Sequence, residues 1–141
     1  MGYLYLGGGK DRGRKIVTPS GKQVRPMTGF LRKVIFEIVQ EEIPGSVVFD
    51  FFAGSGSLGF EALSRGASQV YFLEKDPHLC LLLARNIKTC GFEERARVLK
   101  RDFLHSFPFP SRKIKPDIVF VDPPFSLNSR AVLEKLYNFR M

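Results

Sequence analysis

The sequence predicts an α/β fold in which a Rossmann-like parallel sheet is covered by helices on both faces and preceded by a basic β-hairpin. Short apolar runs alternate with segments of helical periodicity, which is the pattern of βαβ units. The run at 46–52 is almost entirely apolar, as expected for a strand buried on both faces. A glycine-rich loop follows it directly. A chain of 141 residues suffices for one such domain with one core.

Each expected element has a start or a stop signal. Thr28 can cap a helix whose apolar residues recur at helical spacing, at positions 30, 31, 34, 35, 38 and 39. Asp76 followed by Pro77 is a typical helix start, and Gly91 is a typical helix end. We expect strands at 46–52, 69–74, 96–100 and 117–122. We expect helices at 28–40, from the glycine loop to about 64, at 76–90, and from 128 or 129 onward.

The N-terminal segment carries most of the positive charge of the chain. Residues 1–33 hold eight basic residues and one acid, a net +7 out of +8 for the whole chain. A basic segment on a nearly neutral body is typical of a protein that binds a polyanion. We expect residues 1–27 to form an arm with a hairpin turn at Ser20-Gly21, and residues 28–141 to form the sheet domain. The candidate nucleic-acid contacts are Lys10, Arg12, Arg14, Lys15 and Arg25.

The glycine loop indicates a ligand that contains a nucleoside. Gly54, Gly56 and Gly59 form G-x-G-x-x-G between a strand and a helix, which lets the backbone approach a ligand closely. Glu74 ends the next strand, where a carboxylate can accept hydrogen bonds from ribose hydroxyls. Both a dinucleotide and S-adenosylmethionine contain that ribose. Asp50 favours S-adenosylmethionine, because a carboxylate repels a pyrophosphate and attracts the ammonium of a methionine moiety.

The end of the last expected strand has the composition of a pocket for a base amine. Asp122, Pro123, Pro124 and Phe125 follow an apolar run directly. The prolines make the loop stiff and remove its N–H groups, so the Asp122 carboxylate and the Pro123 carbonyl remain as acceptors. Two acceptors can hold the hydrogens of an exocyclic amine and direct its nitrogen at a methyl group, while Phe125 stacks on the base. Asp102, after the third strand, can meet an adenine amino group.

Several segments together resemble a known family. They are GGGKDRGRKI in the arm, VRPMT at 24–28, VVFDFFAGSGSLGFEALSRGAS at 47–68, VYFLEKD at 70–76 and DIVFVDPPF at 117–125. They resemble the bacterial small-subunit ribosomal RNA guanine-N2 methyltransferases, the RsmD family, which depend on S-adenosylmethionine. The resemblance implies a class I methyltransferase fold, and methylation of a guanine N2 in 16S rRNA or in the assembling small ribosomal subunit. The family pattern Arg-Pro-Thr-Thr-Asp differs here, where residues 25–29 read RPMTG.

The same resemblance implies which residues form the site. It places the target base and the catalytic groups at Asp122, Pro123, Pro124 and Phe125. It places S-adenosylmethionine against Asp50, Phe52, Ala53, Gly54, Ser55, Gly56, Glu74, Lys75, Asp102 and Phe103. The basic arm would then hold RNA.

Other expectations concern the length and the setting of the chain. We expect a shortened sheet, because the chain ends at Met141 and the further C-terminal strands that the resemblance implies are missing. Two alternatives remain: a methyltransferase for adenine N6 or another amino group, and a non-catalytic remnant that binds RNA or cofactor. We expect a cytoplasmic monomer without a membrane partner, because no apolar run is long enough for a span or a signal peptide. Cys80 and Cys90 fit no metal-binding spacing, so no metal is expected.

Overall fold

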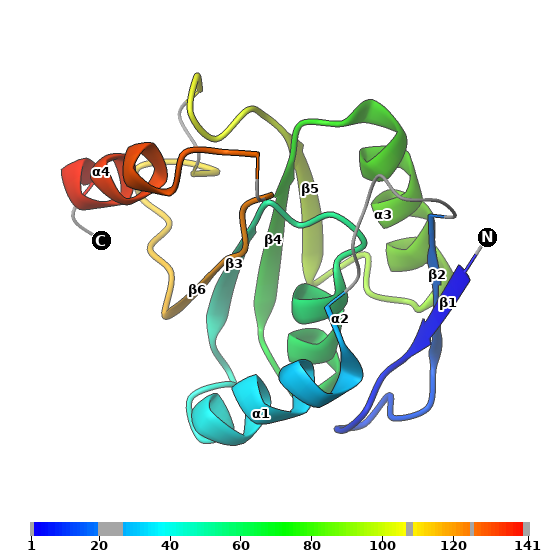
Figure 1. Ribbon diagram of the computed structural model, residues 1–141. Coiled ribbons are helices and arrows are strands. Elements are labelled where there is room, and N and C mark those ends of the chain that lie inside the picture. The colour runs from blue at the N-terminus through cyan, green and yellow to red at the C-terminus, as the bar shows by residue number, and fades with distance from the viewer. Residues whose placement is uncertain (1, 20–26, 107–108, 125, 140–141) are drawn as a thin grey trace.

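A four-stranded parallel sheet forms the centre of the protein, in the strand order β5-β4-β3-β6 (Figure 1). Figure 1 shows the computed structural model of the protein, which describes residues 2–19, 27–106, 109–124 and 126–139. The sheet consists of β3 (Val47–Phe51), β4 (Gln69–Glu74), β5 (Ala96–Lys100) and β6 (Ile118–Val121). The helices are α1 (Gly29–Val39), α2 (Ser57–Ser64), α3 (Pro77–Thr89) and α4 (Ser129–Phe139). A separate antiparallel pair, β1 (Gly2–Tyr5) and β2 (Lys15–Thr18), precedes them.

One face of the sheet packs against the first three helices. Phe36 of α1, Phe60 of α2 and Leu83 of α3 are at most 1% exposed and belong to one apolar cluster with sheet residues such as Phe72. The rings of Phe60 and Phe72 lie 4.8 Å apart. Burying a side chain of this size stabilises a fold by about 1.5–3 kcal/mol, so this cluster fixes the position of α2 behind the glycine loop.

The other face of the sheet packs against α4 and the loop that follows β5. Its cluster joins Phe49 and Phe51 of β3 to Phe103 and Phe109 of the loop and to Val132 of α4. The Phe51 ring lies 5.1 Å from Phe103 and 5.8 Å from Phe109. Helices therefore cover both faces, as the sequence predicts, and the apolar run of β3 is explained by burial on both sides.

The predicted start signals of two helices are confirmed. The Thr28 hydroxyl accepts a hydrogen bond from the Leu31 amide at 3.2 Å. The Asp76 carboxylate accepts from the amides of His78 and Leu79 at 2.8 and 3.2 Å. Such caps satisfy amides that the first turn of a helix leaves without partners.

Three of the six apolar residues that predict α1 are exposed, whereas Ile35 and Val39 pack against the core. Phe30 and Ile38 are 77% and 74% exposed, and the buried residues of this helix are Arg32 and Phe36. The reason is tertiary, because the helix turns its Arg32 toward a buried carboxylate of α2, described next. Helical periodicity identified the element but not the direction it faces.

The N-terminal hairpin exists, but its strands differ from those expected. β1 pairs with β2 so that Gly2 lies opposite Thr18 and Tyr5 opposite Lys15. The connection is therefore the long loop 6–14, closed by a hydrogen bond from the Gly13 amide to the Leu6 carbonyl at 2.8 Å. The turn expected at Ser20-Gly21 lies outside the described residues. The alternation of Tyr-Leu-Tyr in β1 is a strand signal that the predicted elements did not include.

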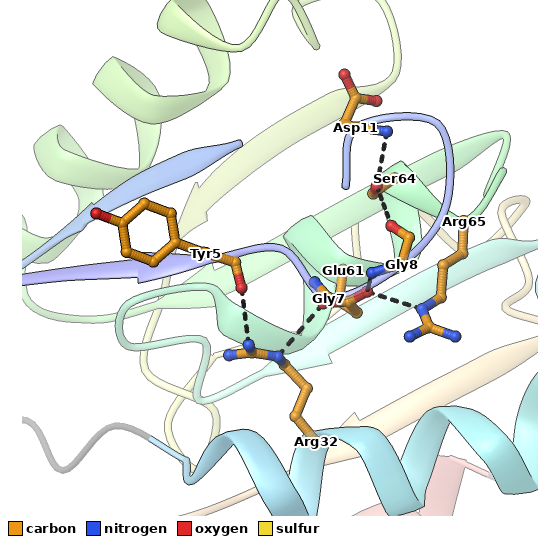
Figure 2. A network of polar contacts seen from close by, with 8 residues as sticks. All are labelled: Tyr5, Gly7, Gly8, Asp11, Arg32, Glu61, Ser64 and Arg65. Atoms are coloured by element: carbon orange, nitrogen blue, oxygen red, sulfur yellow. Dashed lines mark hydrogen bonds and ion pairs between the residues drawn. The ribbon is translucent and has the colours of Figure 1, made fainter. Parts of the chain in front are cut away.

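A buried carboxylate attaches this loop to α2 (Figure 2). Glu61, 1% exposed, accepts hydrogen bonds from the amides of Gly7 and Gly8 at 2.9 and 3.0 Å. Its two oxygens also face the Nε atoms of Arg32 at 3.3 Å and Arg65 at 2.7 Å. The charge of Glu61 is thus compensated by two guanidinium groups and two amides, the condition under which a carboxylate can be buried.

Two further polar side chains fix the arm. The Ser64 hydroxyl donates to the Gly8 carbonyl at 2.6 Å and accepts from the Asp11 amide at 3.0 Å (Figure 2). The Asn86 amide of α3 pairs with both backbone groups of Val17, at 3.1 and 2.8 Å. The arm is therefore docked on α2 and α3.

In the described part of the chain, none of the helices has the length and apolarity that a membrane crossing needs.

Candidate active site at the carboxyl ends of the strands

The parallel register brings the predicted site residues to one edge of the sheet. Phe51, the last residue of β3, lies opposite Leu73 of β4 and Val121 of β6. The glycine loop, Glu74 and Asp122 each follow one of these paired positions in the chain. Ligands of open parallel sheets bind beyond these carboxyl ends, so the register itself assembles the candidate site.

The loop after β3 is held in an unusual backbone conformation. Phe52 has a φ of 57°, in the left-handed region that residues other than glycine rarely adopt. This conformation costs on the order of 1–3 kcal/mol, which the surroundings offset. The Ala53 amide bonds to the Leu73 carbonyl at 3.0 Å, and the Phe52 ring lies 5.0 Å from Phe103. The loop is therefore fixed in shape by the protein itself.

Gly56 is required by both its conformation and its surroundings. Its φ is 81°, and an added Cβ would lie 2.6 Å from Leu83 and 2.7 Å from Phe60. Ser55 beside it is only 5% exposed. No larger side chain fits at position 56 without displacing the core under the loop. The predicted glycine pattern thus has a packing reason here in addition to any ligand.

Glu74 links the glycine loop to the start of α3. One carboxylate oxygen accepts from the Gly54 amide and the other from the Asp76 amide, both at 2.9 Å. Each oxygen has a second lone pair, so the half-buried carboxylate can still accept from a ligand. The predicted ribose contact stays a prediction, but the structure adds a role in holding the loop. Lys75, the next residue, is exposed.

Asp50 is almost completely buried. It is 2% exposed, and its Oδ2 accepts from the amide of Gly59 in the first turn of α2 at 3.1 Å. Burial raises its pKa well above the ordinary value, the Gly59 hydrogen bond opposes this, and the charges of Asp122 and Glu74 raise the pKa further. The carboxylates of Glu74 and Asp122, at the ends of the two neighbouring strands, therefore act on the carboxyl of Asp50.

Asp102 and Phe103 have separate surroundings. The Asp102 carboxylate accepts from the Leu104 amide at 3.1 Å and so shapes the loop after β5. Phe103 is 2% exposed and packs in the second core, so its ring does not line an open site. Sequence reasoning missed Lys135 of α4, which donates to the Ser106 carbonyl at 2.6 Å and ties α4 to this loop. Burial lowers the pKa of Lys135 below its ordinary value, and the charge of Asp102 partly opposes this.

The loop after β6 is open to solvent. Asp122 and Pro124 are exposed and Pro123 is half-buried. The Leu127 amide donates to the Pro124 carbonyl at 2.9 Å. Within the described residues no hydrogen bond engages the Asp122 carboxylate or the Pro123 carbonyl. Both acceptors are thus available to a ligand, while Phe125 lies outside the described residues.

The basic residues of the arm form a second set, apart from these loops. Lys10, Arg12, Arg14 and Lys15 are exposed, and Arg14 lies 3.4 Å from Asp11. Arg25 lies outside the described residues. Among the residues that are described, no group of three or more His, Cys, Asp or Glu side chains could hold a metal ion.

Comparison with known proteins assigns the fold and the family. The chain has the class I methyltransferase fold: it superposes on the solved structure of the Escherichia coli protein yhhF with a TM-score of 0.80 and 35% identity, covering 98% of this chain and 72% of that one. Residues 4–141 match the family described as "Conserved hypothetical protein 95", and the chain belongs to this family.

Two curated relatives carry the name "Ribosomal RNA small subunit methyltransferase D". The one from Haemophilus influenzae is 40% identical over 119 residues, which is 83% of this chain and 61% of the relative. The one from Escherichia coli K12 is 37% identical over 138 residues, 97% of this chain and 66% of the relative. The chain therefore spans slightly less than two thirds of the length of these relatives.

Proposed function

We propose that this protein transfers a methyl group from S-adenosylmethionine to the exocyclic N2 amine of a guanine in 16S ribosomal RNA. The observation that carries the proposal is the meeting of three carboxylates, those of Asp50, Glu74 and Asp122, at adjacent strand ends. Burial is the main cause of the raised pKa of Asp50, and the negative charges of Asp122 and Glu74 raise it further. Such a site favours a cationic ligand and a donor-bearing base.

The charge of the site supports S-adenosylmethionine over a dinucleotide. S-adenosylmethionine, when bound, supplies an electrophilic methyl group on a positively charged sulfur, beside a positively charged ammonium. A pyrophosphate would bring negative charge to the same three carboxylates. Glu74 would accept the ribose hydroxyls, and the backbone of residues 52–56 would lie against the cofactor. Asp102 would meet the adenine, and Lys75 would lie at the rim of the site.

The open acceptors after β6 support an amine as the group that receives the methyl. The Asp122 carboxylate and the Pro123 carbonyl would each accept one N–H of the base amine. This orients the nitrogen lone pair toward the methyl carbon, and alignment of the reacting atoms is a large source of rate. As the nitrogen gains its new bond it becomes acidic, and Asp122 would accept the proton it loses. Phe125 would stack on the base.

The choice of substrate rests on the relatives and on the arm. The two curated relatives are named as methyltransferases of small-subunit ribosomal RNA. Residues 1–33 carry a net +7, and Lys10, Arg12, Arg14 and Lys15 of the arm are exposed, which suits a phosphate backbone. The choice of guanine N2 rests on the family resemblance. The protein would act in the cytoplasm, where such an RNA is found.

The test combines a binding measurement with product analysis. Calorimetric titration with S-adenosylhomocysteine should show binding, whereas NAD should show none. The chain should then transfer methyl groups to 16S rRNA or to small ribosomal subunits, with N2-methylguanosine as the product after digestion to nucleosides. Asp122→Asn should lower the transfer rate by about 100-fold or more, the scale of a proton acceptor in the site. Glu93→Gln, at an exposed acid that precedes the amino end of β5, should change nothing.

Each alternative gives a different result in the same experiment. N6-methyladenosine as the product would identify an adenine enzyme. Binding of S-adenosylhomocysteine and RNA without methyl transfer would identify a non-catalytic protein. Binding of NAD instead would contradict the inference that the three carboxylates disfavour a pyrophosphate.

A further inference from the structure

The outer face of the N-terminal hairpin carries two exposed aromatic rings. Tyr3 and Tyr5 are 53% and 59% exposed, whereas Leu6 of the same segment is 2% exposed and belongs to the core. Alternate residues of a strand face opposite sides, so both tyrosines lie on the side away from the body of the protein. Folding of the core does not require these two rings.

A lysine on the neighbouring strand adds charge to the same face. Lys15 lies opposite Tyr5 in the register, and its Nζ lies 4.2 Å from the centre of the Tyr3 ring. Val17 lies opposite Tyr3, and its backbone N–H and C=O are both occupied by Asn86 rather than by β1. Tyr3 and Val17 thus form a non-hydrogen-bonded pair, at which cross-strand side chains approach most closely. The two rings and the ammonium form one continuous surface.

The hairpin holds this surface in a fixed position. The Arg32 guanidinium donates to the Tyr5 carbonyl at 2.9 Å, and Asn86 holds Val17 from the other strand. Both anchors act on the backbone and leave the tyrosine side chains exposed. A preorganised surface binds with less loss of conformational entropy than a mobile tail.

The surrounding charge indicates what this surface binds. Lys10, Arg12 and Arg14 are exposed in the loop that joins the two strands. Cations beside exposed aromatic rings are the combination by which proteins bind single-stranded nucleic acid, with bases stacked on the rings and phosphates near the cations. An apolar protein partner or a membrane core would not call for this density of positive charge.

We propose that Tyr3, Tyr5 and Lys15 form a stacking platform for unpaired bases of the RNA substrate, outside the methyl-transfer site. This inference rests on the proposed function only in taking RNA as the substrate. The platform binds bases through their flat faces and tolerates differences in sequence. It holds RNA next to the base that enters the site, and it prefers single strands over duplexes, whose bases are already stacked.

The test measures RNA affinity by fluorescence anisotropy, with a short labelled single-stranded RNA of mixed sequence and a duplex of the same composition. Tyr3→Ala and Tyr5→Ala should each weaken single-strand binding by about tenfold, the scale of one lost stacked base, and change duplex binding little. Tyr5→Phe should retain the affinity and Tyr5→Trp should increase it. Tyr137→Ala, at a 70% exposed tyrosine of α4, is the matched control and should have no effect.

Salt dependence separates the two kinds of contact. Lys15→Gln should reduce the slope of log affinity against log salt, because it removes a phosphate contact. The tyrosine variants should leave that slope unchanged. Thermal unfolding of Tyr3→Ala and Tyr5→Ala should match that of the unaltered protein. If these variants are less stable, the RNA affinities of Tyr5→Phe and Tyr5→Trp test the platform instead.

Failure of the platform and failure of the proposed function are distinguishable. Full RNA affinity in both alanine variants, or binding of the unaltered protein to lipid vesicles but not to RNA, would overturn the platform. Tyrosine-dependent RNA binding without methyl transfer would support the platform and contradict the proposed function. Methyl transfer that is unaffected by either alanine variant, with unchanged RNA affinity, would support the function and overturn the platform.

Discussion

The N-terminal arm and the strand-end loops are held in place by opposite means. The arm is fixed by polar side chains of helices that bond to its backbone, namely Glu61, Ser64 and Asn86. The loop after β3 is fixed mainly by its own backbone conformation and by aromatic packing, with Phe52 against Phe103 and Gly56 against Phe60, and Glu74 adds one hydrogen bond from the Gly54 amide. One region depends on satisfied hydrogen bonds and the other on shape.

This difference determines how each region can be disrupted. The arm should loosen at Gly7 and Gly8 when a single buried charge is removed, because both of these amides bond to Glu61. The loop should tolerate changes of charge but not the addition of one methyl group.

The largest expected effect comes from Glu61→Gln. This change keeps the volume but removes the charge between Arg32 and Arg65, of which Arg32 is only 9% exposed. Breaking a buried ion pair in this way costs about 3–5 kcal/mol. Urea unfolding should show a loss of this size, and hydrogen exchange should show the Gly7 and Gly8 amides less protected.

The matched control for Glu61 is an ion pair of the same kind on the surface. Glu134 pairs with Arg130 at 3.0 Å, four residues apart, and both side chains are largely exposed. Glu134→Gln should cost at most about 1 kcal/mol. Equal losses for the two variants would show that the Glu61 network does not hold the arm.

A smaller effect is expected from Gly59→Ala, which tests the dependence on shape. An added Cβ would lie 2.2 Å from a ring carbon of Phe72, so α2 would have to move away from the sheet. Such overpacking costs about 1–3 kcal/mol. Thermal unfolding should show the loss, and affinity for S-adenosylhomocysteine should fall with it because α2 begins where the glycine loop ends.

Gly29→Ala is the control for this change. No atom lies within 4 Å of a Cβ added at position 29, at the start of α1. Replacing glycine by alanine where the backbone permits it stabilises proteins by about 0.4–1 kcal/mol. If Gly59→Ala were equally harmless, the close packing of α2 on the sheet would not constrain the loop.

An effect on stability of opposite sign comes from Asp50→Asn. Burial raises the pKa of Asp50 in the folded state, so the stability that its neutral form contributes is fully present below the unfolded pKa of about 3.9. It is lost as the pH rises toward the folded pKa. At pH 7 the asparagine variant should therefore be more stable than the unaltered protein, and the difference should vanish below about pH 4.

The same variant separates stability from binding. If the charge of Asp50 serves the cofactor, the more stable variant should bind S-adenosylmethionine more weakly at pH 7, by about 1–3 kcal/mol. A variant that is more stable and binds equally well would remove Asp50 from the proposed site. A variant that is less stable at pH 7 would show that the buried charge is compensated.

The sheet could be predicted well because its signals are local. The strands 69–74 and 96–100 occur as expected, and Thr28 and Asp76 cap their helices. These features depend on residues within a few positions of one another. The position of the acids at the strand ends could be predicted in the same way. Once the strands are known, a parallel sheet gathers their ends at one edge.

The features that the sequence did not predict depend on contacts between residues far apart in the chain. The hairpin register is set by Asn86, which lies 69 positions from Val17. The face that α1 buries is set by Glu61, which attracts Arg32 inward and leaves Phe30 outside. No sequence pattern within α1 carries that information. The burial of Asp50 likewise depends on an amide of the following helix.

The side-chain amide of Asn86 also affects the solubility of this protein. A two-stranded hairpin has free edges, and a free edge offers unpaired N–H and C=O groups to strands of other molecules. By bonding to both backbone groups of Val17, Asn86 occupies the centre of one edge of β2 as a further strand would. The arm can thus present two aromatic residues to solvent while that edge resists the growth of intermolecular sheets.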